Sequence, residues 1–182
     1  MTKNVGAKNE TDAGKYFAWG MKEGYYANQI KDNMFTNDWY KQQEIVDWNG
    51  YQFEDGSYAP SKEQIKELID NCTHGFITYT GVKGSMFTSK INGNSIFLSA
   101  GGTGSKGALG DVGFGGSFWL SCLSESYPYS AQGLDFDCSG ADCYYGSRCY
   151  GGSVRGVVAA STNVSDAVTD AVKAIINHSL LS

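Results

Sequence analysis

Acidic and thiol side chains are concentrated in one short stretch, Gly133 to Gly156, which reads GLDFDCSGADCYYGSRCYGGSVRG. Counted from Asp135, the stretch has acidic residues at the first and third places, then a Ser and a Gly at the fifth and sixth, as in an EF-hand calcium loop. The twelfth place of that loop needs a bidentate Glu, but the chain has Gly146 there. The missing ligand argues against calcium, so we expect no metal or other cofactor at this loop.

The cysteines of the same stretch allow three interpretations. Cys138, Cys143 and Cys149, with Asp142, have the ligand types of a zinc site, but their spacings contain no C-x₂-C pair. Cys138 and Cys143 could instead close a small disulfide loop, although the chain has five cysteines, an odd number. In the third interpretation Cys143 and Cys149 are incidental and Cys138 is a small filler. The lack of a pairing pattern favours this third interpretation.

The sequence has few of the residue patterns that catalytic sites require. His74 and His178 are the only histidines, and no Ser or Cys lies in a G-x-S-x-G turn. We therefore predict that the protein is not an enzyme, because no nucleophile can be matched with a base.

The charge and hydropathy of the chain argue against several classes of partner. The formal net charge is −5 and there is no basic run, which argues against nucleic acid and anionic membranes as partners. No stretch reaches the roughly 18 apolar residues of a membrane span. The first residues, MTKNVGAKNETDAGKYF, lack the apolar core of a signal peptide. We expect synthesis without a signal, or an excised segment of a longer chain.

The elements that must position these residues are short. Abundant Gly and aromatic residues indicate turns and irregular loops, above all in residues 4–58. A helix is predicted from Ser61 to about Asn71, because Ser61 and Gln64 form a capping box. A hairpin is predicted with strands 86–91 and 95–99 around an Asn-Gly turn. Residues 115–121 and 151–159 are further predicted strands, with loop and short strand pieces between them.

The last part of the chain has a different pattern. Ser165 can cap a helix over about 166–178, which would carry apolar residues on one face. Such a short helix needs a partner, either its own domain or copies of itself. The domain prediction is one unit at 1–159 and a helical extension at 160–182.

Six segments, in order, resemble the Bacteroidetes and Fibrobacter succinogenes major paralogous domain family. They are NVGAKNETDAGKYFAWG (4–20), APSKEQIKEL (59–68), GVKG (81–84), NGNSIFLSAGG (92–102), GFGGSFWLS (113–121) and RCYGGSVRGV (148–157). Ser99 and Leu120 depart from the residues usual in the family. The resemblance implies an α+β, C-type-lectin-like fold with a framework helix, to which the C-terminal helix would be added.

Some proteins with the fold that the resemblance implies are variable proteins of diversity-generating retroelements, in which template adenines are miscopied so that AAY codons become NNY. NNY codons cannot encode Lys, Glu, Gln, Met or Trp, and Gly133–Gly152 contains none of these residues. The resemblance therefore places a variable region at about 118–155. The implied variable, ligand-binding positions are Leu120, Cys122, Tyr129, Gly133, Asp135, Asp137, Cys143, Tyr144, Tyr145, Ser147, Cys149, Tyr150 and Gly152.

The remaining residues of that region are expected to be framework. Leu134 and Phe136 alternate with Asp135 and Asp137, which is strand periodicity with one buried face. Arg155 is interpreted either as a buried, hydrogen-bonded guanidinium beside Trp119 or as an exposed charge. The full framework set is Trp119, Leu134, Phe136, Arg148, Ser153, Val154 and Arg155.

The resemblance implies a receptor-binding adhesin, at a phage tail fibre for host attachment or on a bacterial cell surface. Its partner would be a cell-surface protein or glycan, bound by a Tyr-rich face, and a homo-oligomer such as a trimer would add avidity. The alternative is a non-diversified bacterial surface lectin-like protein that binds glycan, with or without calcium.

Overall fold

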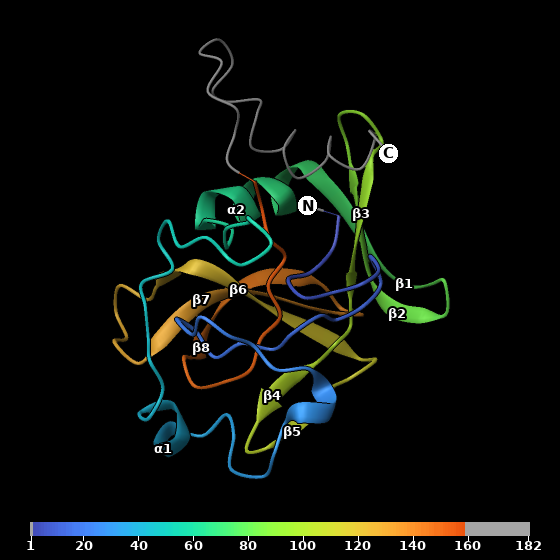
Figure 1. Ribbon diagram of the computed structural model, residues 1–182. Helices are drawn as coiled ribbons and strands as arrows, with labels where there is room; N and C mark the ends of the chain where they lie inside the picture. Colours follow the sequence, from blue (N-terminus) through green and yellow to red (C-terminus); the bar gives the residue numbers. More distant parts are fainter. Residues whose placement is uncertain (1, 159–182) are drawn as a thin grey trace.

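The computed structural model describes residues 2–158, and this part of the chain is built mainly from three antiparallel sheets (Figure 1). Two sheets have three strands, in the orders β1-β2-β3 and β6-β7-β8, and the third is the small hairpin β4-β5. The elements in chain order are η1 Ala27–Gln29, α1 Asn37–Tyr40, α2 Lys62–Asn71, β1 Cys72–Tyr79, β2 Val82–Ser89, β3 Ser95–Ser99, β4 Thr103–Ser105, β5 Ala108–Gly110, β6 Gly115–Leu123, β7 Ser130–Asp137 and β8 Ala141–Ser147.

The predicted helix is confirmed as α2. The Ser61 side chain accepts from the Gln64 backbone N–H at 3.3 Å, and the Gln64 side chain accepts from the Ser61 N–H at 2.8 Å. This capping box satisfies two backbone donors that the first turn leaves open. Ile65 and Leu68 are buried, so the apolar stripe of the helix faces the β-sheets.

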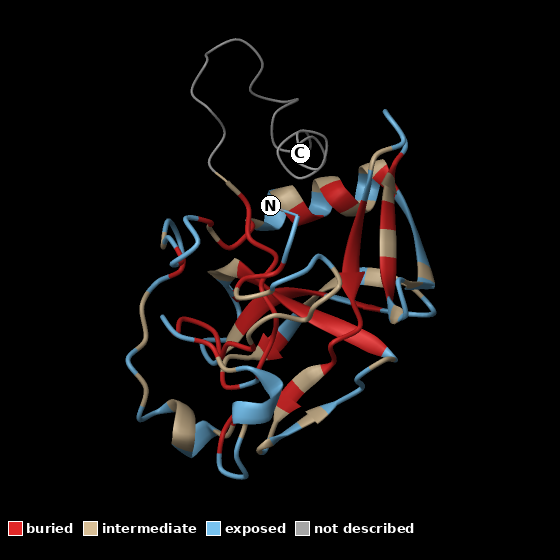
Figure 2. Ribbon diagram, turned by 45° about the vertical axis from the view of Figure 1, so that its right-hand side comes forward, coloured by how far each residue is buried: buried red, intermediate tan, exposed pale blue. Residues whose placement is uncertain are grey.

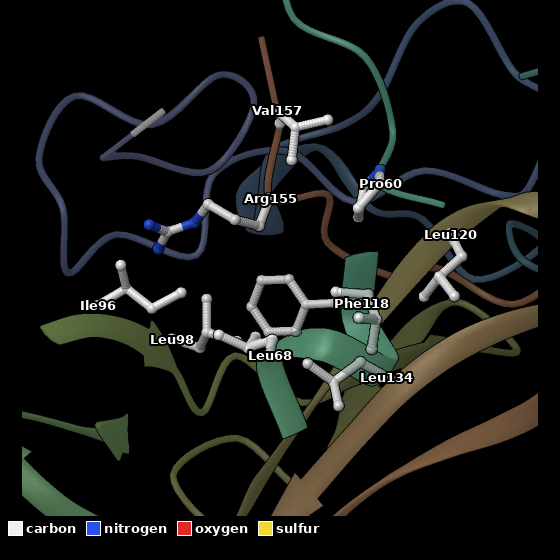
Figure 3. A pocket seen from close by; sticks show the side chains of 11 residues that line it. Pro60, Leu68, Ile96, Leu98, Phe118, Leu120, Leu134, Arg155 and Val157 are labelled. Carbon is white, nitrogen blue, oxygen red and sulfur yellow. The ribbon is translucent and has the colours of Figure 1, made fainter. Parts of the chain in front are cut away.

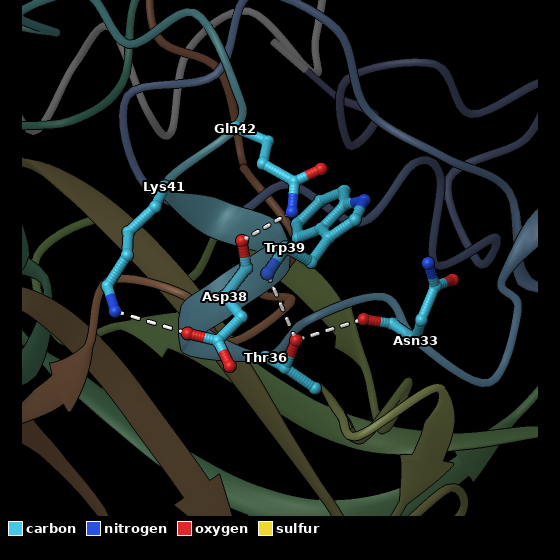
Figure 4. A network of polar contacts seen from close by, with 6 residues as sticks. All are labelled: Asn33, Thr36, Asp38, Trp39, Lys41 and Gln42. Atoms are coloured by element: carbon cyan, nitrogen blue, oxygen red, sulfur yellow. Dashed lines mark hydrogen bonds and ion pairs between the residues drawn. The ribbon is translucent and has the colours of Figure 1, made fainter.

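A single turn of helix, α1, is held by local polar contacts (Figure 4). Thr36 Oγ1 accepts from the Trp39 N–H at 3.2 Å and donates to the Asn33 carbonyl at 3.0 Å. Lys41 pairs with Asp38 at 3.1 Å on the exposed side. The N-cap and the pair fix a turn too short to be stable alone.

The predicted hairpin is confirmed by β2 and β3, which pair antiparallel from Gly84↔Ser99 to Thr88↔Ser95. Gly93 in the connecting turn has φ +77°, a conformation that Gly adopts without strain. The β1 strand pairs with the other side of β2 over its whole length.

The β6-β7-β8 sheet separates two buried clusters. One face packs on α2 and the β1-β2-β3 sheet, with Phe118, Leu120 and Leu134 among the buried residues; we call this cluster the helix-side core. The other face carries Trp119, which packs against Phe17, Trp19 and Trp48; we call this cluster the N-terminal core. The irregular N-terminal segment therefore takes the place of a second sheet on that face.

The end of the described chain runs back through the molecule as isolated bridges. Gly152 pairs with Phe17, Ser153 with Phe118, and Val157 with Tyr58. The predicted strand at 151–159 is thus present only as single bridges over its described residues. These contacts bury residues 151–157 and connect the N-terminal segment to β6 (Figure 2).

The prediction of an α+β, C-type-lectin-like fold is wrong. The described chain is predominantly β, and α2 is its one helix longer than a single turn. The stretch expected to be mostly loop forms the antiparallel strands β7 and β8. The predicted C-terminal helix and the whole 160–182 extension lie outside the described residues.

Candidate binding surface

The strand β7 shows the alternation expected from the sequence. Leu134 and Phe136 are buried in the helix-side core, whereas Asp135 and Asp137 are exposed on the opposite face. The register Ser117↔Asp135 and Asp135↔Asp142 places Asp135 of β7 between Ser117 of β6 and Asp142 of β8. One end of the sheet face that carries Trp119 is therefore acidic.

Exposed tyrosines gather at the other end of the same strands. Tyr129 is 83% exposed, Tyr145 is 55% exposed and Tyr150 is 40% exposed. The Arg148 N–H donates to the Tyr129 carbonyl at 3.0 Å, and Ser130 pairs with Ser147, so the loop before β7 lies beside the end of β8. Three of the predicted ligand-binding residues thus lie at one end of the sheet.

Two further exposed side chains at this end were missed by the sequence reasoning. Tyr127 is 62% exposed and Leu123 is 41% exposed. Both lie within the predicted variable region of 118–155, but outside the stretch that lacks Lys, Glu, Gln, Met and Trp. For Tyr127 the available signal was the segment SESYPYS (124–130), whose Ser and Pro residues are typical of an exposed turn. We call Leu123, Tyr127, Tyr129, Tyr145 and Tyr150 the tyrosine rim.

Four predicted ligand-binding positions are buried, which corrects their assignment to the surface. Leu120 has no exposed area and lines a cavity of about 20 Å³ in the helix-side core (Figure 3). Cys149 is only 3% exposed, and Gly133 and Gly152 are also buried. A side chain at Gly152 would lie 2.8 Å from the Trp119 ring. These positions cannot offer side chains to a ligand.

The remaining predicted positions are partly buried. Cys122 and Cys143 pack at the margin of the helix-side core, and Ser147 lies near Cys149, with Oγ and Sγ 3.2 Å apart. Tyr144 packs against the N-terminal core, and burial raises the pKa of its hydroxyl well above the ordinary value. Tyr144 therefore belongs more to the framework than to the exposed surface.

Arg148 is a framework residue that positions the Tyr129 loop. Its guanidinium lies 5.3 Å from the Trp19 ring and 5.5 Å from the Tyr40 ring, which are cation–π distances. It also donates to the Tyr40 hydroxyl at 3.0 Å and to the Pro128 carbonyl at 3.2 Å. One side chain thus connects the loop before β7 to the N-terminal segment.

Arg155 is buried and hydrogen-bonded, as one interpretation predicted, but its hydrogen-bond partners lie on residues 2, 4 and 97 and not on Trp119. It donates to Asn4 Oδ1 at 2.8 Å, to the Thr2 carbonyl at 2.8 Å and to the Phe97 carbonyl at 2.6 Å. Burial lowers the pKa of the guanidinium to about 10, which leaves it charged at neutral pH. The other predicted framework residues, Trp119, Leu134, Phe136, Ser153 and Val154, are all buried.

The acidic end of the sheet borders a polar cleft of about 290 Å³. Ser117 Oγ donates to Asp135 Oδ1 at 2.8 Å, and Ser117 Oγ lies 2.6 Å from Thr103 Oγ1. Asp135 is exposed as a residue but its carboxyl is partly buried; this partial burial raises the pKa of the carboxyl, and the neighbouring Asp137 and Asp111 add to the rise. Asp135 thus combines a raised pKa with a side chain that still faces solvent.

The Asp137 carboxylate accepts hydrogen bonds within its own turn. Its Oδ1 accepts from the Ser139 hydroxyl at 2.5 Å, the Ser139 N–H at 2.6 Å and the Gly140 N–H at 3.2 Å. The Ser139 side-chain hydrogen bond is the main cause of the lowered pKa of Asp137. Within residues 2–158, no three His, Cys, Asp or Glu side chains come together as a metal site would require.

The five cysteines all lie in the described chain, and each is a free thiol there. The interpretation of a Cys138–Cys143 disulfide is therefore wrong for this structure. Burial raises the pKa of the Cys72, Cys122 and Cys143 thiols, which reduces the fraction of reactive thiolate.

A comparison of the chain with protein-family models, curated proteins and solved structures gives no match. Over the described residues, no helix has the length and apolar character needed to cross a membrane.

Proposed function

We propose that this chain is a receptor-binding adhesin whose β7–β8 surface is diversified by a retroelement, in the setting of a phage tail fibre. The observation that supports it most is the placement of the restricted stretch 133–152. Its apolar members Leu134 and Phe136 are in the core, while Asp135, Asp137, Tyr145 and Tyr150 are exposed. A surface that is rewritten codon by codon needs this separation, because exposed positions tolerate replacement.

The chemistry of the tyrosine rim suits recognition of a cell-surface protein or glycan. Tyr offers a large amphipathic area with few rotatable bonds, so it loses little entropy when it is immobilised. The rim is held by Arg148 and by the β7–β8 ladder, which reduces the cost of ordering it. Diversification is supported by the residue types of 133–152, which all fit NNY codons, and by the family resemblance.

The diversification is tested in the DNA that surrounds the gene. We expect a reverse-transcriptase gene and a near-copy of the 3′ end of this gene, which differs from it only where the copy has adenine. The mismatches should fall in codons of exposed residues such as Tyr129, Asp135 and Tyr145. Mismatches at other template bases would overturn the proposal.

The binding activity is tested with the purified chain on beads, mixed with a panel of intact bacterial cells. Tyr129→Ala and Tyr145→Ala are expected to lower cell capture, because both remove exposed area from the rim. Ile91→Ala is the matched control, since Ile91 is 74% exposed but lies in the β2–β3 turn. Capture that falls equally for all three variants would contradict a binding role for the rim.

A further inference from the structure

The β1 strand is an open edge of the β1-β2-β3 sheet. It pairs with β2 over eight residues, and no backbone group of 73–79 bonds to another strand among the described residues. Its residues from Thr73 to Thr78 are exposed except for the half-buried Phe76 (Figure 2). Such an edge presents a row of unpaired N–H and C=O groups to solvent.

This edge lacks the features that normally prevent strand pairing. The sequence CTHGFITY contains no Asp, Glu, Lys, Arg or Pro, and its register with β2 has no bulge. Thr73, Phe76, Ile77, Thr78 and Tyr79 are residue types that favour strands.

The other edges of the two three-stranded sheets are protected within the described chain. The outer edge of β6 is covered by residue 153, because the Trp119 N–H donates to the Ser153 carbonyl at 2.9 Å. The outer edge of β3 is covered by Arg155, which donates to the Phe97 carbonyl at 2.6 Å. The edge strand β8 carries the exposed charge of Asp142. Among the edges of the two three-stranded sheets in residues 2–158, β1 is thus the one that is both uncharged and uncovered.

We infer that β1 is a homodimer interface, in which the β1 strands of two copies pair antiparallel and join two three-stranded sheets into one of six. A second copy fits this edge because a two-fold axis places the middle of β1 against its own copy. Because the two-fold axis brings identical residues close together, a charged residue in β1 would lie near the same charge of the second copy. β1 has no Asp, Glu, Lys or Arg, so pairing of two β1 strands meets no such repulsion.

The dimer would leave the tyrosine rim free. β1 lies at the side of the molecule away from β8 and from the loop after β6 (Figure 1). Two copies would then present two rims, which raises avidity without a new ligand contact. The inference itself rests only on the β1 edge and does not need the rim to bind a receptor.

Gly75 at the middle of β1 allows a test that leaves the monomer intact. A Cβ at Gly75 would meet no atom within 4 Å, so a long side chain fits there. In the antiparallel pair, residue 75 lies opposite itself or within two positions of itself. Gly75→Lys and Gly75→Glu should each disfavour the dimer, whereas an equimolar mixture of the two should restore it as a heterodimer.

The measurement is sedimentation equilibrium of the full chain from about 1 µM to about 300 µM, a range that covers the dissociation constants of small interfaces. We expect dimers for the wild type and a rise of about tenfold or more in the dissociation constant for each single variant. Ile91→Lys adds a charge at an equally exposed site outside β1 and should dimerise like the wild type. Circular dichroism of each variant confirms that it is folded.

A wild type that is monomeric throughout this range, or trimeric, would overturn the inference. So would a dimer that Gly75→Lys and Gly75→Glu leave unchanged while both variants remain folded. Loss of cell capture by rim variants with the dimer intact would separate this interface from the proposed binding function.

Discussion

Tyr144 of β8 stacks on Trp119 of β6, with ring centroids 5.9 Å apart and ring planes inclined by 24°. Trp119 has no exposed area, and its Nε1–H donates to the Phe17 carbonyl at 2.8 Å. The two rings therefore link the edge of the candidate binding surface to the N-terminal core. Neighbouring tyrosines of one strand thus have different roles, since Tyr145 points to solvent.

Truncation of the two tyrosines should separate these roles. Tyr144→Ala removes a packed ring and is expected to lower the free energy of unfolding by about 2 kcal/mol. Tyr145→Ala, in the same strand, should change it by less than about 0.5 kcal/mol. Denaturant unfolding of both variants measures the difference. A cost at Tyr145 equal to that at Tyr144 would contradict the assignment of the two side chains.

Gly133 lies directly opposite Tyr144 in the β7–β8 register. A Cβ at Gly133 would lie 2.2 Å from Cε1 of Tyr144 and 2.9 Å from the Phe118 carbonyl oxygen. Gly133→Ala should therefore cost about 1–3 kcal/mol in unfolding free energy, because the Tyr144 ring must move off Trp119.

The control for Gly133 is in the same hairpin. A Cβ at Gly140 meets no atom within 4 Å, so Gly140→Ala should be within about 0.5 kcal/mol of the wild type. In the double variant Gly133→Ala/Tyr144→Ala, the two costs should not add, because the first substitution acts through the second ring. Full additivity would show that the contact is not the cause.

The sequence predicted those elements whose signals are local. The α2 helix followed from Ser61 and Gln64, which are three residues apart, and the β2–β3 hairpin followed from one Asn-Gly turn. The alternation of buried and exposed side chains in β7 was also predictable, because Leu134 and Phe136 are two residues apart. Each of these signals depends on residues close in sequence, so no tertiary information was needed.

The errors arose where burial depends on distant segments. Gly152 is covered by Trp119, and Leu120 lines a cavity with Ile96 and Leu98 from another sheet. The restricted set of residue types in the stretch 133–152 does not distinguish buried positions from exposed ones. The α+β class was wrong for another reason: this stretch was predicted as loop with short strand pieces, but residues 130–147 pair as the continuous β7–β8 hairpin.

The buried serines Ser85 and Ser89 should affect stability in opposite directions when each is replaced by Ala. Ser85 Oγ is buried and has no hydrogen-bond partner among the described residues, whereas Ser89 Oγ accepts from the Ile91 and Asn92 N–H groups at 3.2 Å and 3.4 Å. Ser85→Ala removes an unpaired polar group and should raise the free energy of unfolding by about 1 kcal/mol. Ser89→Ala should lower it by about 1 kcal/mol. Thermal unfolding of the pair tests the difference in sign, and a destabilised Ser85→Ala would contradict it.

Asp135 and Asp137 should respond to pH in opposite directions. The pKa of Asp135 is raised by burial, so the folded state binds its proton more tightly than the unfolded state. The charged carboxylate therefore opposes folding at neutral pH, and this penalty is relieved as the pH falls through the folded-state pKa. The pKa of Asp137 is lowered, mainly by Ser139, so its contribution is present above the ordinary pKa of 3.8 and is lost in acid.

The matching variants are Asp135→Asn and Asp137→Asn, followed by denaturant unfolding from neutral to acidic pH. Asp135→Asn keeps an acceptor for Ser117 and should stabilise the protein at neutral pH by less than about 1 kcal/mol, because the residue also faces solvent. Asp137→Asn should destabilise at neutral pH and have no effect once the wild-type carboxylate is protonated. Two effects of the same sign at neutral pH would contradict the assignment.

The placement of the restricted stretch predicts which positions tolerate random replacement. A library that places NNY codons at Tyr129, Asp135, Tyr145 and Tyr150 changes four exposed side chains, and most of its members should remain folded. The control library places the same codons at Leu134, Phe136 and Val154, which are buried; loss of one such side chain costs about 2–5 kcal/mol, of a total stability of about 5–15 kcal/mol. Protease resistance of the displayed chains measures the folded fraction. Equal survival of the two libraries would mean that the exposed face is as constrained as the core, and the surface could not then be a site of diversification.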